Sequence, residues 1–309
     1  MSELDGAERL DPALRAVATT RTDFTPAAIA LMREPFNERR RVAAAQTDAR
    51  GVLIADDAAP APGRSVPVRI YRGAPPPAPA VVYCHAGGFA LGNLDTDHRQ
   101  CVELADRGRC TVVSVDYRLA PEHPYPAALD DARAVLRWVA ASAAELGVDA
   151  ARLAVAGSSA GAALAACLAH DAAHGAAPPV AFQLLHQPVL DDRPTPSKGE
   201  FRASPAFDGE AAELMWRYYL GTADPPPAAV PARRPASGDH PPALITCAEI
   251  DPFRDEAVHY ARALLRAGAP AELHVFAGAC HGFDSLLPDW SESRRLYALQ
   301  GDALRRAFA

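Results

Sequence analysis

The chain has 309 residues, of which 49% are hydrophobic and 22% are charged, a balance typical of a globular protein with a buried core. Its formal net charge of −7 provides no basic surface to neutralise phosphates, which argues against nucleic acid and stable membrane association. The N-terminus lacks the basic and apolar regions of a signal peptide and no long apolar stretch follows, so we expect a cytoplasmic protein.

The elements predicted along the chain begin with a helical pattern over residues 1–45, which stands outside the alternation that follows. From about Val66, short apolar runs alternate with longer amphipathic ones, the pattern of βαβ units and a largely parallel sheet. The predicted strands are 66–71, 80–84, 111–116, 153–156, 182–186, 244–248 and 273–276. We assign residues 46–190 and 223–309 to this α/β core.

A glycine-rich turn, His85-Ala86-Gly87-Gly88-Phe89, directly follows the strand 80–84. Ester hydrolysis develops negative charge on the carbonyl oxygen, and backbone N–H groups released by such a turn can stabilise that oxyanion. A plain glycine loop is the simpler reading. The position of the turn at the carboxyl end of a strand favours an oxyanion hole.

The sequence Gly157-Ser158-Ser159-Ala160-Gly161 lies between the strand 153–156 and an alanine-rich helical run over 160–174. This strand–turn–helix context is typical of a nucleophile elbow, in which flanking glycines allow a strained turn that presents the central Ser159 hydroxyl. Further helices are predicted over 127–146, 253–267 and 290–308 from their apolar stripes. The sequence therefore predicts Ser159 as a nucleophile.

Two segments interrupt the core between the strands 182–186 and 244–248. Residues 191–222 carry a further helical run, and we predict that they form a lid together with residues 1–45. Residues 224–242 contain too many prolines for a helix or a central strand, so we expect a returning loop.

The partners of Ser159 are expected later in the chain, in the order acid and then histidine. Asp251 follows the strand 244–248 and His281 follows the strand 273–276, so both lie at the sheet edge where α/β proteins place their active sites. His281 would take the proton of Ser159, and Asp251 would fix its tautomer. Asp255 and Glu249 are rival acids, one a turn into the next helix and the other directed away.

These motifs resemble the hormone-sensitive-lipase family of bacterial esterases and lipases, in the α/β-hydrolase superfamily. The likeness covers about residues 60–290 and lies in HAGG at 85–88, GSSAG at 157–161, DPFRDE at 251–256 and HGF at 281–283. It implies an α/β-hydrolase fold with a mostly parallel central sheet flanked by helices and a small helical cap. It also implies a serine carboxylesterase for short to medium acyl esters, with oxyanion donors at the backbone amides of Gly87, Gly88 and Ala160.

The resemblance further implies that no cofactor is needed, and such enzymes are often homodimers. The chain departs from the family motifs at Ala86, which replaces the first glycine of HGGG, and at Ser158, which replaces the usual Asp or Thr. Alanine is acceptable at position 86 if its backbone angles are ordinary, because it still supplies an N–H group. Any contact that relatives make through the residue before the nucleophile is in doubt for this chain.

Other readings remain open at this point. The same triad could serve an amidase or N-acetyl hydrolase, and related folds include ligand-binding receptors that lack the histidine. An interfacial lipase is disfavoured because no long apolar lid is evident. The cysteines lack zinc or redox spacing and are expected to be reduced core residues, so we expect no metal; they are Cys84, Cys101, Cys110, Cys167, Cys247 and Cys280.

Overall fold

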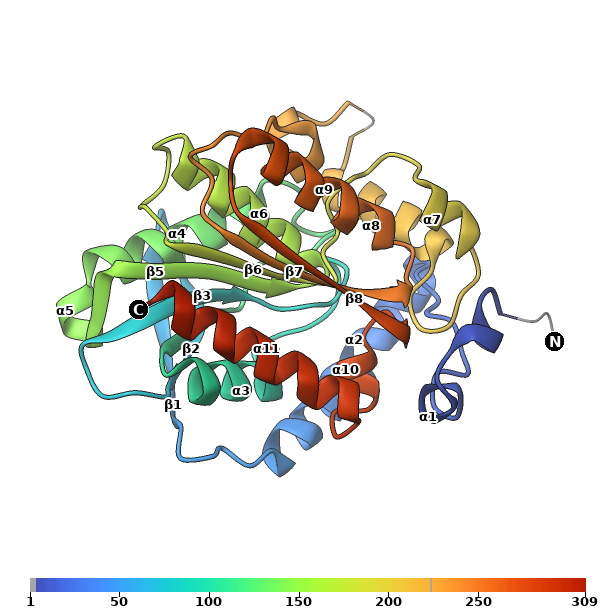
Figure 1. Cartoon of the computed structure of the whole chain (residues 1–309), viewed down its shortest axis with the longest axis horizontal. Coiled ribbons are helices and arrows are strands. Elements are labelled where there is room, and N and C mark those ends of the chain that lie inside the picture. Colours follow the sequence, from blue (N-terminus) through green and yellow to red (C-terminus); the bar gives the residue numbers. More distant parts are fainter. Residues whose placement is uncertain (1–3, 223) are drawn as a thin grey trace.

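A mixed sheet of eight strands forms the centre of the computed structural model, which describes residues 4–222 and 224–309 (Figure 1). The strand order is β1-β2-β4-β3-β5-β6-β7-β8, antiparallel from β1 to β4 and parallel from β4 to β8. The strands are β1 Leu53–Ala61, β2 Arg64–Arg72, β3 Ala78–Cys84, β4 Thr111–Val115, β5 Val148–Ser158, β6 Phe182–His186, β7 Ala243–Ile250 and β8 Ala271–Cys280. The predicted α/β class with a mostly parallel sheet is confirmed.

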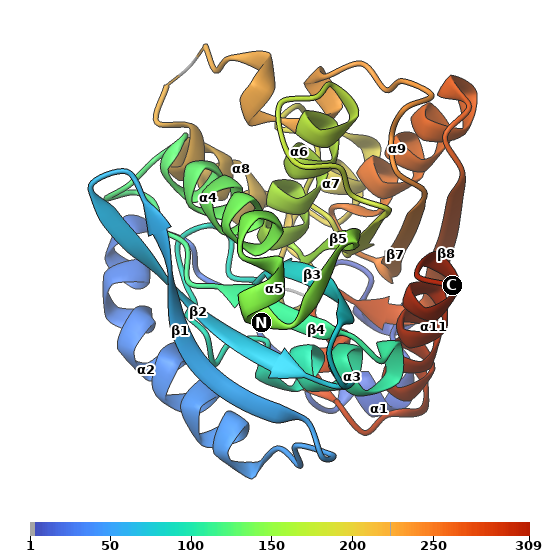
Figure 2. The ribbon, with the colours of Figure 1, turned by 90° about the vertical axis from the view of Figure 1, so that its left-hand side faces the viewer.

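Helices cover both faces of this sheet (Figures 1 and 2). One face carries α4 Ala127–Ala141, α6 Ala160–Ala173 and α9 Arg254–Ala267, and the other carries α3 His98–Gly108 and α11 Ser291–Ala307. Side chains of a strand point alternately to the two faces, so Val82 packs in the larger core cluster while Val81 and Tyr83 pack in the cluster under α3 and α11. Two short helices complete this part of the chain: α5 Ala143–Leu146 follows α4, and α10 Phe283–Leu286 follows β8.

Strand β1 lies outside the predicted strands. Its sequence, LIADDAAPA, contains two aspartates and a proline, and only Ala59 among its residues is fully buried. The pairing with β2 nevertheless runs from Leu53 opposite Arg72 to Ala61 opposite Arg64, across the turn at Pro62 and Gly63. Backbone pairing at a sheet edge therefore forms this strand without the apolar alternation that sequence analysis requires.

The remaining helices lie or begin at the end of the sheet toward which the arrowheads of β7 and β8 point in Figure 1, and the longest of them runs from there back toward α3. They are α1 Pro12–Arg15 and α2 Pro26–Gln46 in the N-terminal segment, and α7 Pro196–Glu200 and α8 Gly209–Leu220 in the insertion after β6. Short 3-10 turns occur at Ala7–Arg9, Pro227–Ala229 and Pro231–Arg233.

The N-terminal segment and the insertion contact each other directly, although they are far apart in the sequence. The N–H group of Thr22 donates to the Ala206 carbonyl at 2.7 Å, and the N–H group of Ala206 donates to the Thr20 carbonyl at 2.9 Å. The Arg21 guanidinium also pairs with the buried carboxylate of Asp208 at 2.6 Å. These contacts join the two segments over the carboxyl ends of the strands.

Candidate active site

Ser159 occupies the sharp junction between β5 and α6. Its φ of 55° and ψ of −119° are strained for a residue with a side chain, and its N–H group is held by the His186 carbonyl at 2.8 Å. Close backbone contacts explain the flanking glycines, because a Cβ on Gly161 would lie 2.0 Å from the Cys84 carbonyl oxygen. The turn therefore fixes the direction in which the Ser159 hydroxyl projects.

A continuous line of hydrogen bonds joins Ser159, His281 and Asp251. Ser159 Oγ lies 2.9 Å from His281 Nε2, and His281 Nδ1 lies 2.9 Å from Asp251 Oδ2. The other carboxylate oxygen, Asp251 Oδ1, accepts the N–H group of Phe253 at 2.8 Å, so both oxygens of this fully buried acid are engaged. This is the geometry in which a histidine can accept the serine proton while a carboxylate orients its ring.

The two rival acids have other partners. Glu249 pairs with Arg9 through Oε1 and accepts the Gly278 N–H group through Oε2 at 2.9 Å. Asp255 accepts the Ser197 N–H group at 2.9 Å and the Arg254 guanidinium at 3.0 Å. The structure therefore brings Asp251, and neither of its rivals, to the imidazole of His281.

The glycine-rich turn after β3 presents free backbone donors beside Ser159. Gly87 and Gly88 have φ angles of 132° and 61°, whereas the φ of Ala86 is negative, so alanine is unstrained at that position. The N–H group of Ala86 is already used by Asp97 Oδ2 at 2.8 Å. Within residues 4–222 and 224–309, the N–H groups of Gly87, Gly88 and Ala160 have no acceptor.

Aromatic rings shield the site from water. The rings of Phe253 and Phe207 lie 5.2 and 5.6 Å from the His281 imidazole, and Phe24 packs edge-on against Phe207 at 5.3 Å. Ser159 is only 5% exposed. Because Phe24 belongs to the N-terminal segment and Phe207 to the insertion, both segments contribute to this apolar roof, which strengthens the electrostatic interactions beneath it.

Two further residues of the site have no signal in the sequence motifs. Gln187 accepts the Gly282 N–H group at 2.7 Å and donates to the Cys280 carbonyl at 3.2 Å, so it holds the turn that carries His281. Asp97 accepts both the Ala86 N–H group and the Tyr83 hydroxyl. Asp97 directly precedes α3, and its residue type alone indicates no such role.

The cysteines are free and buried, including Cys280 beside His281. Burial raises the pKa of the Cys280 thiol to about 12, so this thiol stays protonated at neutral pH and is a poor nucleophile. Among residues 4–222 and 224–309, no group of His, Cys, Asp and Glu side chains has an arrangement suited to a metal ion. No helix in that part of the chain has the length and apolar character needed to cross a membrane.

Comparisons with known proteins show which family and which proteins the chain resembles. A family model described as the alpha/beta hydrolase fold matches residues 81–285. The chain is 38% identical to esterase LipI of Mycobacterium tuberculosis over 293 residues, 92% of each protein. It is 42% identical to carboxylesterase NlhH of the same species over 230 residues, 71% of each. The crystal structure of esterase LipW from Mycobacterium marinum superimposes with a TM-score of 0.97 at 67% identity, covering 99% of this chain and 98% of that one.

Proposed function

Because the chain belongs to the alpha/beta hydrolase fold family and is a carboxylic ester hydrolase of the hormone-sensitive-lipase-like group, we propose that it cleaves esters through an acyl-enzyme intermediate. Ser159 is the proposed nucleophile, His281 the general base and Asp251 the orienting acid. The single observation that supports these roles is the unbroken hydrogen-bonded line from Ser159 Oγ through the imidazole to a buried carboxylate. No cofactor is needed for this chemistry.

In the first half of the proposed reaction, Ser159 Oγ attacks the carbonyl carbon of the ester while its proton passes to His281 Nε2. Asp251 stabilises the imidazolium that forms and keeps the other ring nitrogen protonated in the resting state. The imidazolium then gives its proton to the departing alcohol, which leaves an acyl group on Ser159. In the second half, water attacks this acyl ester with His281 as the base, and the imidazolium returns the proton to Ser159 Oγ as the bond from Oγ to the acyl carbon breaks and the carboxylic acid leaves.

The proposed oxyanion donors are the backbone N–H groups of Gly87, Gly88 and Ala160. Gly87→Ala is expected to lower kcat for a short-chain ester about 100-fold, in the range for loss of one oxyanion donor. The reason is that an added Cβ would lie 2.1 Å from the Leu91 carbonyl oxygen at a φ that side chains rarely adopt, so the turn must move. Steady-state kinetics with p-nitrophenyl acetate, together with circular dichroism, provide the measurement.

The matched control for this turn is Ala86→Gly, which restores the family motif at a position with a negative φ. Its kcat is expected to stay within about twofold of the parent enzyme, because the N–H group of residue 86 already binds Asp97. A folded Gly87→Ala enzyme with parental kcat would exclude this turn from the oxyanion hole.

We further propose that residues 1–45 and 191–222 form a cap over the two core segments, 46–190 and 223–309. The backbone bonds between Thr22 and Ala206 and the contact of Phe24 with Phe207 support this division. A roof that leaves Ser159 only 5% exposed favours soluble esters with short to medium acyl groups over large lipids. A cytoplasmic location, the absence of a nucleic-acid partner or stable membrane association, and a homodimer stay predictions from the sequence.

A graded series of p-nitrophenyl esters tests the substrate class. Hydrolysis of the acetate, butyrate, hexanoate, decanoate and palmitate is expected to peak at one of the first three and to fall steeply for the palmitate. Matching anilides should react far more slowly, because an amine leaving group requires earlier protonation by His281. Faster cleavage of the anilides, or a maximum at the palmitate, would replace the carboxylesterase assignment by an amidase or a lipase.

A further inference from the structure

The short helix α7 of the insertion is anchored in the loop that carries Asp251. Ser197 is completely buried there and makes three hydrogen bonds, one with Pro252 in that loop and two with Asp255 in the first turn of α9. Its hydroxyl donates to the Pro252 carbonyl at 2.8 Å and accepts the Asp255 N–H group at 3.2 Å, while its own N–H group donates to Asp255 Oδ2 at 2.9 Å. Ser197 therefore fixes the backbone one residue beyond Asp251.

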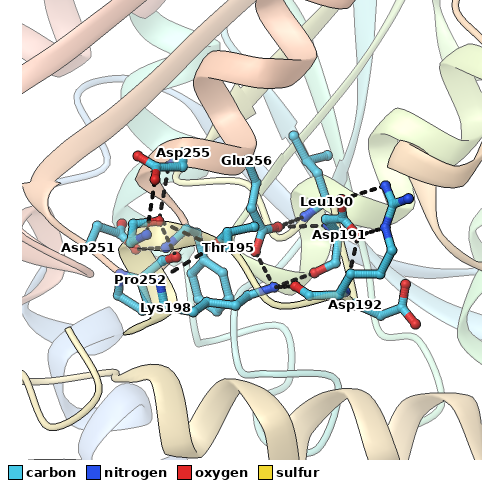
Figure 3. Close-up of polar contacts among 12 residues, drawn as sticks. Leu190, Asp191, Asp192, Thr195, Lys198, Asp251, Pro252, Asp255 and Glu256 are labelled. Carbon is cyan, nitrogen blue, oxygen red and sulfur yellow. Dashed lines mark hydrogen bonds and ion pairs between the residues drawn. The ribbon is translucent and has the colours of Figure 1, made fainter. Parts of the chain in front are cut away.

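The next residue of α7, Lys198, makes a buried ion pair with Glu256 at 2.6 Å, as Figure 3 shows. The ammonium group of Lys198 also donates to the carbonyls of Asp191 at 2.5 Å and Arg193 at 2.9 Å. Burial raises the pKa of Glu256 to about 7, against the opposing effect of Lys198. Taking both charges out of water is costly, so such a pair adds little stability compared with apolar residues of similar volume.

Glu256 also connects the acid loop to the chain that supports the nucleophile. Its Oε2 accepts the N–H groups of Leu190 and Asp191 at 2.6 and 2.7 Å. The neighbouring Val189 donates its N–H group to the Ser159 carbonyl at 3.3 Å. The Glu256 carboxylate thus links α9, the helix after Asp251, to the segment that follows β6. That segment binds the backbone of Ser159 through Val189.

We propose that Ser197 and Lys198 are positioning residues for ester hydrolysis, which act by holding the Asp251 loop in register with the nucleophile elbow. Neither residue touches the reacting atoms; both act through Asp251 and Glu256. A shift of the carboxylate by a few tenths of an ångström would weaken its bond to His281, and small misplacements of catalytic groups cost large factors in rate. This inference rests on the proposed role of Asp251 as the acid.

Ser197→Ala, compared with Thr195→Ala on the same helix, tests the proposal. Thr195 caps α7 by accepting the Lys198 N–H group at 3.4 Å, and its hydroxyl oxygen lies 3.4 Å from that of Ser197, a long hydrogen bond. Ser197→Ala is expected to lower kcat for p-nitrophenyl butyrate about tenfold with little change in KM. The rate of inactivation by a small p-nitrophenyl phosphate triester should fall by the same factor. Thr195→Ala should lower the melting temperature similarly and leave kcat unchanged.

A second variant keeps the test decisive if Ser197→Ala fails to fold. The charge-neutral double variant Lys198→Met/Glu256→Gln is expected to lower kcat about tenfold, because the tether between α7 and α9 is lost. Its control is Asp171→Asn, which removes a buried carboxylate paired with Arg133 and Arg234. Asp171 lies 12 positions beyond Ser159, roughly 18 Å along α6, so only stability should change.

The outcomes separate this inference from the proposed function. Equal kcat values for Ser197→Ala and Thr195→Ala, or parental kcat in the double variant, would overturn the positioning role while leaving the triad intact. Hydrolysis that survives in Ser159→Ala would instead overturn the proposed function itself. A drop in kcat confined to Ser197→Ala and the double variant supports the inference.

Discussion

Replacing Ser159 with alanine is expected to lower kcat for p-nitrophenyl butyrate by about 10⁶-fold, the loss typical of removing a triad nucleophile. Alanine cannot form the acyl-enzyme, so any remaining hydrolysis must come from water attacking an ester held by the oxyanion donors alone. The fold should be retained, because alanine tolerates the φ of 55° as well as serine does and the Ser159 N–H bond to His186 does not involve the side chain. Steady-state kinetics and thermal melting measure both expectations.

The adjacent Ser158 provides the matched control for that substitution. Ser158 is also a buried serine but belongs to β5, and Ser158→Ala is expected to keep kcat within a few-fold of the parent. A p-nitrophenyl phosphate triester should label the parent and Ser158→Ala on the peptide containing Ser159, and should not label Ser159→Ala. Undiminished turnover by Ser159→Ala would discard the assignment of the nucleophile.

The central strands can be predicted because burial on both faces demands continuous apolar sequence. All seven residues of β3 and all five of β4 are buried, and the predicted boundaries of these strands differ from the structure by one or two residues. Strand β1 escapes prediction because its stability comes from backbone pairing with β2 at an edge, where side chains face solvent. A sequence pattern records side-chain burial and does not record pairing of this kind.

The residues of the candidate site likewise fall into two groups, those that a sequence motif predicts and those that none predicts. Ser159, Asp251 and His281 can be proposed from the sequence because each follows a strand in a short motif whose order is characteristic. Gln187 and Ser197 cannot, because their partners lie 95 and 58 positions away and no local pattern reports that contact. The proposed catalytic groups thus leave a local signature, whereas the groups proposed to hold them in place depend on packing between distant segments.

Asp251→Asn is expected to lower kcat for the same ester by about 10⁴-fold with little loss of stability. The Phe253 N–H group donates to Asp251 Oδ1 at 2.8 Å, and in the variant this bond would retain the amide oxygen at that position. The amide NH₂ group would then face His281 Nδ1 and donate to it. The ring would carry its proton on Nε2, where it can no longer accept the proton of Ser159. Kinetics measured alongside thermal melting separate this tautomer effect from unfolding.

The result for Asp251→Asn is best compared with the same substitution at the rival acid, Asp255. This residue is only four positions away and is also partly buried. Asp255 is bonded to Ser197 and Arg254 and makes no contact with the imidazole, so Asp255→Asn should cost no more than about tenfold in kcat, through the loop alone. A loss of about 10⁴-fold in Asp255→Asn with a mild effect in Asp251→Asn would reverse the two roles. The buried bond between Asp251 Oδ2 and His281 Nδ1 at 2.9 Å argues for Asp251 as the acid, since a carboxylate orients a histidine only through direct contact with its ring.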